Sequence, residues 1–101
     1  MKQQRLKPDA SKEDILAVAL PLAEKLGYAK VTRQQVGQAA GVSGPVLNYH
    51  FGTMAQFKRD LMRYAVKCES LAVVAQGLTS GDSQAQKAPE ELRRRALDSL
   101  F

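Results

Sequence analysis

Small and polar side chains alternate with apolar anchors along residues 33–52, RQQVGQAAGVSGPVLNYHFG, and this spacing suits contact with the edges of DNA bases. Two short helices that meet at a steep angle need a small residue where they cross and a left-handed residue at the turn. Gly37 and Gly41 occupy these two positions. The residues that would anchor both helices to a core are Val36, Ala40, Val42, Leu47 and Phe51. The segment therefore predicts a helix-turn-helix.

The second of these two helices would turn a polar face outward. The outward residues are small near the amino end and hydrogen-bonding further along: Ser43, Gly44, Pro45, Val46, Asn48 and Tyr49. A helix that enters the major groove by its amino end needs such a face. Asn48 could contact adenine N6 and N7 together, or be a plain surface residue. The apolar surface of Pro45 and Val46 suits a thymine methyl group, or these residues only start the helix.

Neighbouring polar residues have alternative interpretations. Gln34 is a candidate for a base edge and Arg33 for a phosphate, whereas Gln35 is expected to cap the first helix of the motif. Tyr49 is expected to contact the DNA backbone. His50 has no acidic or thiol companion in the motif, so we exclude metal binding and catalysis for it and leave phosphate contact and packing open.

Helices are expected to position this motif. Patterns in which Ser or Thr is followed three residues later by Asp or Gln predict helix starts at Ser11, Thr32 and Thr53. The first helix should stop at Gly27, with a kink or early break at Pro21. No alternating strand pattern is present, so we expect an all-α fold of about five helices.

A heptad pattern follows the motif. Met54, Leu61, Cys68 and Ala75 recur every seven residues, and Phe57, Tyr64, Leu71 and Leu78 follow each by three. This pattern predicts one long helix over residues 54–78, then a polar break at 79–87 and a last helix that starts at Pro89. We expect these helices to pair across a two-fold axis through Phe57, Leu61, Tyr64, Cys68, Leu71, Leu78, Leu92, Leu97 and Leu100.

Two features of this carboxyl-terminal half have both a structural and a functional interpretation. Cys68 lies on the apolar seam, which favours an inert buried thiol over a redox sensor. The run Arg93-Arg94-Arg95 favours the solvated face of a helix over a grip on DNA.

The 101 residues suffice for one compact domain, which we divide into a flexible basic arm (1–10), a DNA-binding part (11–52) and a helical dimerisation part (53–101). The net charge of the chain is +5, and residues 1–60, with nine basic and five acidic side chains, carry most of it. This uneven charge suggests a polyanionic partner. In the arm, Lys2, Arg5 and Lys7 could enter a minor groove, follow phosphates, or do nothing.

Composition excludes several classes of protein. One cysteine and one histidine build neither a structural zinc site nor a disulfide framework, so a reducing, cytoplasmic setting is expected. The sequence contains no run of eighteen apolar residues, the length that would be needed to cross a membrane. We find no constellation of nucleophile, base or metal ligands, and therefore expect neither an enzyme nor a cofactor.

Residues 15 to about 61 resemble the tetracycline-repressor (TetR) family of bacterial transcriptional regulators. The resemblance includes an ILxxAL-like first helix, Leu26-Gly27-Tyr28, Thr32, Val36, Ala39-Ala40-Gly41-Val42-Ser43, Leu47 and Tyr49-His50-Phe51. It implies that Ser43–Phe51 is the recognition helix, that Thr32 to Gln34 also touch DNA, and that the later helices form a dimer. Asn48 replaces the family's usual aromatic residue and Met54 its usual lysine, for which Lys58 or Arg59 could substitute.

The resemblance also bears on regulation. Family members run to about twice this length and carry a large helical ligand-binding domain, so a small-molecule effector is not expected here. We expect a homodimeric repressor that binds a palindromic operator in double-stranded DNA. The alternative is a helical protein–protein module, an inhibitor or antitoxin-like adaptor, that binds DNA only non-specifically.

Overall fold

The computed structural model describes residues 11–100, and this range is helical without a strand. The elements in chain order are α1 (Lys12–Leu26), a 3-10 turn η1 (Tyr28–Lys30), α2 (Arg33–Ala40), α3 (Gly44–Phe51), α4 (Met54–Lys67), α5 (Leu71–Ser80), α6 (Ser83–Gln86) and α7 (Glu90–Asp98). The expected all-α fold is confirmed. The basic arm with Lys2, Arg5 and Lys7, and Phe101 at the other end, lie outside the described residues.

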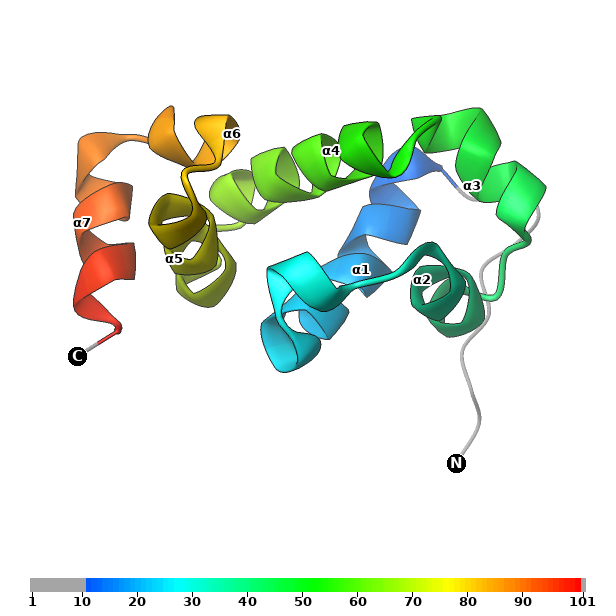
Figure 1. Cartoon of the computed structure of the whole chain (residues 1–101), viewed down its shortest axis with the longest axis horizontal. Helices are drawn as coiled ribbons and strands as arrows, with labels where there is room; N and C mark the ends of the chain where they lie inside the picture. Colours follow the sequence, from blue (N-terminus) through cyan, green and yellow to red (C-terminus); the bar gives the residue numbers. More distant parts are fainter. Residues whose placement is uncertain (1–10, 101) are drawn as a thin grey trace.

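Figure 1 shows that α4 links two groups of helices. α2 and α3 lie at one end of the long axis, with α1 below α4, whereas α5, α6 and α7 lie together at the other end. α4 packs against α1 and α3 on one side and against α5 and α6 on the other. We call α1–α3 with the adjoining part of α4 the amino-terminal unit, and α5–α7 the carboxyl-terminal unit.

The three predicted capping boxes are present at Ser11, Thr32 and Thr53. In each, the hydroxyl accepts a hydrogen bond from the backbone N–H three residues later, and the side chain of that later residue accepts one from the capping residue's N–H. These bonds satisfy amides that the first turn of a helix leaves without a partner. The starts of α1, α2 and α4 are therefore determined by local sequence.

The predicted break at Pro21 is wrong, because α1 continues through this residue to Leu26. Proline removes one backbone donor and frees the carbonyl of Ala17. Both Ala17 and Pro21 are exposed, so water can hydrogen-bond that carbonyl. The buried face of the same helix, at Ile15, Ala19 and Ala23, is fully enclosed and fixes α1 against the other helices.

A close helix crossing sets the angle between α2 and α3. Gly41 adopts the left-handed conformation (φ 72°, ψ 31°) that ends α2. A Cβ atom on Gly37 would lie 3.0 Å from the Val42 carbonyl oxygen and 3.6 Å from Leu47 Cδ1. Leu47 and Phe51 are buried, and the Phe51 and Phe57 rings meet edge to face with centroids 5.0 Å apart. The predicted corner is confirmed in this detail.

The single long helix predicted for residues 54–78 is wrong. α4 ends at Lys67, and Glu69 then adopts a left-handed φ of 57° before α5 begins. The backbone N–H of Ser70 donates to the Ala65 carbonyl at 2.8 Å and that of Glu69 to Val66 at 3.1 Å, which is a Schellman turn with glutamate in the usual glycine position. Two long-range contacts hold the turn: Ser70 Oγ donates to Glu24 at 2.6 Å, and Glu69 pairs with Arg95 at 3.3 Å.

The break redistributes the nine residues expected on a dimer seam. Phe57, Leu61 and Leu92 are buried in the chain's own core and offer no surface to a partner. Tyr64, Leu71 and Leu78 are half-buried, and only Leu97 (40% exposed) and Leu100 (51%) are large exposed hydrophobic residues among the nine. Cys68, expected in the core, is exposed because the chain turns there.

The carboxyl-terminal unit packs through small residues. α5 contacts both α6 and α7, and the fully buried Ala75, Ala85 and Ala96 lie on these three helices. α6 lies in the segment predicted to be a polar break, where Asp82 caps it by accepting hydrogen bonds from the N–H groups of Gln84 and Ala85. The arginine run lies on α7, where Arg93 donates to the Ala88 carbonyl and Arg94 pairs with Glu90, which agrees with a structural role.

Candidate nucleic-acid interface

The predicted recognition helix α3 presents its first turn to solvent. Ser43 caps it by accepting a hydrogen bond from the Val46 N–H at 3.4 Å, and Pro45 lies in the first turn where its missing N–H costs nothing. Ser43, Gly44 and Pro45 are exposed, and a Cβ atom on Gly44 would meet nothing within 4 Å. The amino end of α3 is therefore slim and open.

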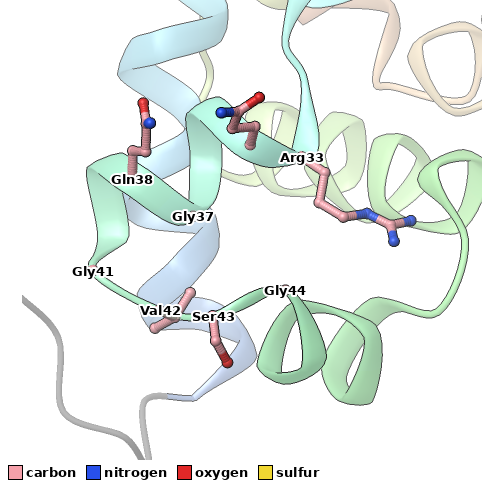
Figure 2. A pocket seen from close by; sticks show the side chains of 8 residues that line it. Arg33, Gly37, Gln38, Gly41, Val42, Ser43 and Gly44 are labelled. Atoms are coloured by element: carbon pink, nitrogen blue, oxygen red, sulfur yellow. The ribbon is translucent and has the colours of Figure 1, made fainter.

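An open groove lies between α2 and α3. It is lined by Arg33, Gln34, Gly37, Gln38, Gly41, Val42, Ser43 and Gly44. Figure 2 shows Gln38 and Arg33 leaving α2 in different directions, with Ser43 and Gly44 across the turn. The structure thus brings the predicted candidates at the amino end of α2 together with those at the amino end of α3.

The remaining outward residues of α3 divide into two groups. Asn48 is exposed and Tyr49 is 86% exposed, as predicted. Val46 is half-buried and packs on the core, so only part of its side chain faces outward. His50 is half-buried between its ring neighbours, with its centroid 5.2 Å from that of Tyr49 and 6.2 Å from that of Phe51.

A second concave surface continues from Asn48 toward α1 and α4. Its lining residues are Lys12, Asn48, Tyr49, His50, Phe51, Gly52, Gln56, Arg59 and Asp60. Lys12 pairs with Asp60 at 3.3 Å and lies 5.7 Å from the Phe51 ring centroid, which ties the start of α1 to α3 and α4. Arg59 is exposed and makes no ion pair with the described residues, so its charge is available to a phosphate.

Lys58 does not join this surface. Its ammonium donates to the Ala29 carbonyl at 3.1 Å and lies 5.9 Å from the Tyr28 ring centroid, whereas Arg59 lines the concave surface. Arg59 was available from the sequence as the neighbouring cation on α4. Lys12 was missed, since only the fold places the start of α1 beside the end of α3.

A buried tyrosine fixes the segment that leads into α2. Tyr28 Oη lies 2.8 Å from the Lys58 carbonyl and 3.1 Å from Asp82 Oδ2, and its backbone N–H donates to Gln76. Burial raises the pKa of Tyr28 well above its ordinary value near 10, and the charge and hydrogen bond of Asp82 add to the rise. Tyr28 therefore stays neutral and connects the amino-terminal unit to α5 and α6.

A metal centre and a membrane-spanning helix are both absent from the described residues. Among residues 11–100, no group of three His, Cys, Asp or Glu side chains could hold a metal ion. Every helix in the same range is too short or too polar to cross a bilayer.

Residues 15–61 match the model of the bacterial regulatory proteins, tetR family. This range runs from the buried face of α1 through α2 and α3 into α4, so it contains both surfaces described above. No curated protein and no solved structure is similar enough to the chain to count as a match.

Proposed function

We propose that this chain, whose residues 15–61 match the tetR family of bacterial regulatory proteins, is a homodimeric cytoplasmic repressor that binds a palindromic operator. The observation that carries the proposal is the open amino end of α3. It lies on the same groove as the amino end of α2, and the two helices cross at Gly37. A slim helix end enters the major groove, and the residues behind it then reach base edges.

Charge and polar groups on the flanks favour DNA over a protein partner. Arg59 lies on the concave surface beside α3, where it suits a phosphate on one side of the groove, and Lys12 on the same surface is paired with Asp60. Ser43 on the groove and Tyr49 on the concave surface offer hydroxyl groups, and Thr32 at the start of α2 is also exposed. Phosphate contacts would fix the position of the domain, while Gln34 and Asn48 are the candidates for base contacts.

A dimer is proposed for two reasons. One recognition helix covers only a few base pairs, and two-fold symmetry supplies two half-sites about one helical turn, or a multiple of it, apart. The exposed Leu97 and Leu100 leave apolar surface on and just beyond α7 that a second copy would cover. We expect Leu100→Ser to shift the protein toward the monomer in sedimentation equilibrium, and an unchanged association constant would place the interface elsewhere.

Selection of bound duplexes from a random pool tests the DNA-binding proposal, because it reports sequence, symmetry and half-site spacing together. Affinity for the selected duplex and for a scrambled one is then measured at one fixed salt concentration, since phosphate contacts make affinity strongly salt-dependent. We expect a ratio above about 10³. A smaller ratio, with no consensus, would favour the helical protein–protein module instead.

Matched glutamine variants sharpen this test. Gln34→Ala should cost about 1–3 kcal/mol on the selected duplex and little on scrambled DNA. Gln86→Ala removes an exposed glutamine from α6, far from the proposed interface, and should change neither affinity. Equal losses for the two variants would contradict the placement of the interface.

Repression would be steric, with operator occupancy set by the concentration of the protein itself. The groove and the concave surface described above are both open and belong to the proposed DNA face. A specific small molecule that releases the purified protein from its operator would contradict control by concentration alone.

A further inference from the structure

One side-chain pair joins the two helices of the proposed DNA-binding face. Arg33, the first residue of α2, donates from Nη1 to Asn48 Oδ1 of α3 at 2.6 Å and from Nη2 to the Gly52 carbonyl at 3.4 Å. Figure 2 shows the Arg33 side chain leaving the first turn of α2 and extending toward α3. The two residues that the sequence assigned to a phosphate and to a base are therefore in contact.

This contact fixes which way the Asn48 amide is turned. A guanidinium group carries only donors, so the amide atom that faces Arg33 must be the oxygen. The amide nitrogen then retains both N–H groups, and no hydrogen bond to a described residue engages them. Because Asn48 is exposed on α3, these donors remain available to a ligand.

The orientation changes which base Asn48 can contact. A bidentate contact with adenine needs the amide oxygen to accept from N6 while the nitrogen donates to N7. Here the oxygen already accepts a charge-assisted hydrogen bond, which is about twice as strong as a neutral one. Adenine would have to compete with Arg33, whereas guanine offers the acceptors N7 and O6 and asks only for donors.

We propose that Arg33 sets the base preference of Asn48, so that the pair acts as one donor group that selects guanine in each half-site. This inference rests on the proposed function, because it concerns the same DNA-binding face. It replaces the contact with adenine that the sequence suggested for Asn48. Arg33 acts as a positioning residue, since its effect on the base passes through the Asn48 amide.

Arg33 also lies beside the carboxyl end of α3. Its side chain lies at a small apolar cavity that is also lined by Val36, Leu47, Phe51, Gly52, Thr53 and Phe57. Its hydrogen bond to Gly52 reaches the residue that ends α3. Arg33→Met keeps an unbranched apolar stem at this cavity and removes only the guanidinium group.

The test is selection of duplexes from a random pool by the wild type, Arg33→Met, Asn48→Ala and Arg59→Met. The position contacted by Asn48 is the one whose preference disappears in Asn48→Ala. There the wild type should prefer guanine over adenine by about 5- to 150-fold, the range that one bidentate contact provides. Arg33→Met should reverse this preference toward adenine, because it releases the amide oxygen, and leave the other positions unchanged.

Arg59→Met is the matched control, since it removes an exposed arginine from the same face without touching Asn48. It should weaken binding to all duplexes and retain guanine. Retention of guanine by Arg33→Met, loss of all preference there, or adenine in the wild-type consensus would overturn the inference while leaving sequence-specific binding intact. Absence of any consensus for the wild type would instead overturn the proposed function.

Discussion

The amino-terminal and carboxyl-terminal units are built on different principles. In the amino-terminal unit, α1, α2 and α4 begin at complete capping boxes and α2 and α3 meet at a glycine corner. In the carboxyl-terminal unit, α5 and α7 begin without any side-chain cap, and close packing of small residues takes over. The first arrangement leaves the outer side chains free for a ligand, whereas the second makes stability depend on tight interhelical fit.

Substitution of Met62 should have the largest effect on stability, and it tests how the two units depend on each other. It is completely buried on α4, and its side chain reaches α5 at Gly77. Met62→Ala should lower the free energy of unfolding by about 2–5 kcal/mol, through lost burial and the cavity that remains. Because α4 packs against both units, we expect them to unfold together, in one unfolding transition by circular dichroism and by amide hydrogen exchange. Two separated unfolding transitions would show that the units are independent.

A pair of glycine substitutions compares the interhelical fit directly. A Cβ atom on Gly77 would lie 2.8 Å from Ala85 Cβ and 2.5 Å from Met62 Cε, so Gly77→Ala should cost about 1–3 kcal/mol in chemical denaturation. At Gly37, the tightest contact would be 3.0 Å, and alanine also gains up to about 1 kcal/mol in helix propensity. A larger loss for Gly37→Ala would reverse the comparison. Gly44→Ala, in open space, is the control.

Tyr28 connects the two units and gives the smallest predicted effect. Tyr28→Phe loses the hydrogen bonds to the Lys58 carbonyl and to Asp82, at a cost of about 1–2 kcal/mol near neutral pH.

The loss should depend on pH in a defined direction. The pKa of Tyr28 is raised in the folded state, so its contribution to stability is complete below pH 10, the ordinary tyrosine value, and declines as pH rises beyond it. The difference in unfolding free energy between wild type and Tyr28→Phe should therefore shrink above pH 10. A difference that grows with pH would contradict this assignment. The same measurement on Tyr64→Phe gives a reference for a second tyrosine with a raised pKa. Hydrogen bonding with Cys68 raises the pKa of Tyr64, which lies on an accessible face.

The helix-turn-helix could be predicted because its signals act over a few residues. A capping box closes over three residues, and Gly41 ends α2 by its own backbone conformation. Gly37 and Leu47 then follow from the spacing that a helix crossing requires. The same reasoning placed Ser43, Asn48 and Tyr49 on the outer face of α3, where the structure has them.

The carboxyl-terminal half was mispredicted because a periodic apolar pattern does not reveal a turn. Cys68 and Leu71 continue the heptad on both sides of the corner, and no glycine or proline marks it. Glu69 adopts the left-handed conformation in a turn closed by backbone hydrogen bonds, and two contacts from distant helices, Ser70 with Glu24 and Arg95 with Glu69, accompany it. The same corner exposes Cys68, while Phe57 and Leu61 lie in the central core and Leu92 is buried on α7.

Sequence alone therefore determined the all-helical class, the starts of α1, α2 and α4 and the corner between α2 and α3, since these depend on backbone hydrogen bonds within one or two turns. Tertiary structure decided where α4 stops, which leucines remain exposed, and that Arg33 holds the Asn48 amide. Those outcomes depend on residues 15 to 46 positions apart in the chain, whose proximity is a property of the packed fold.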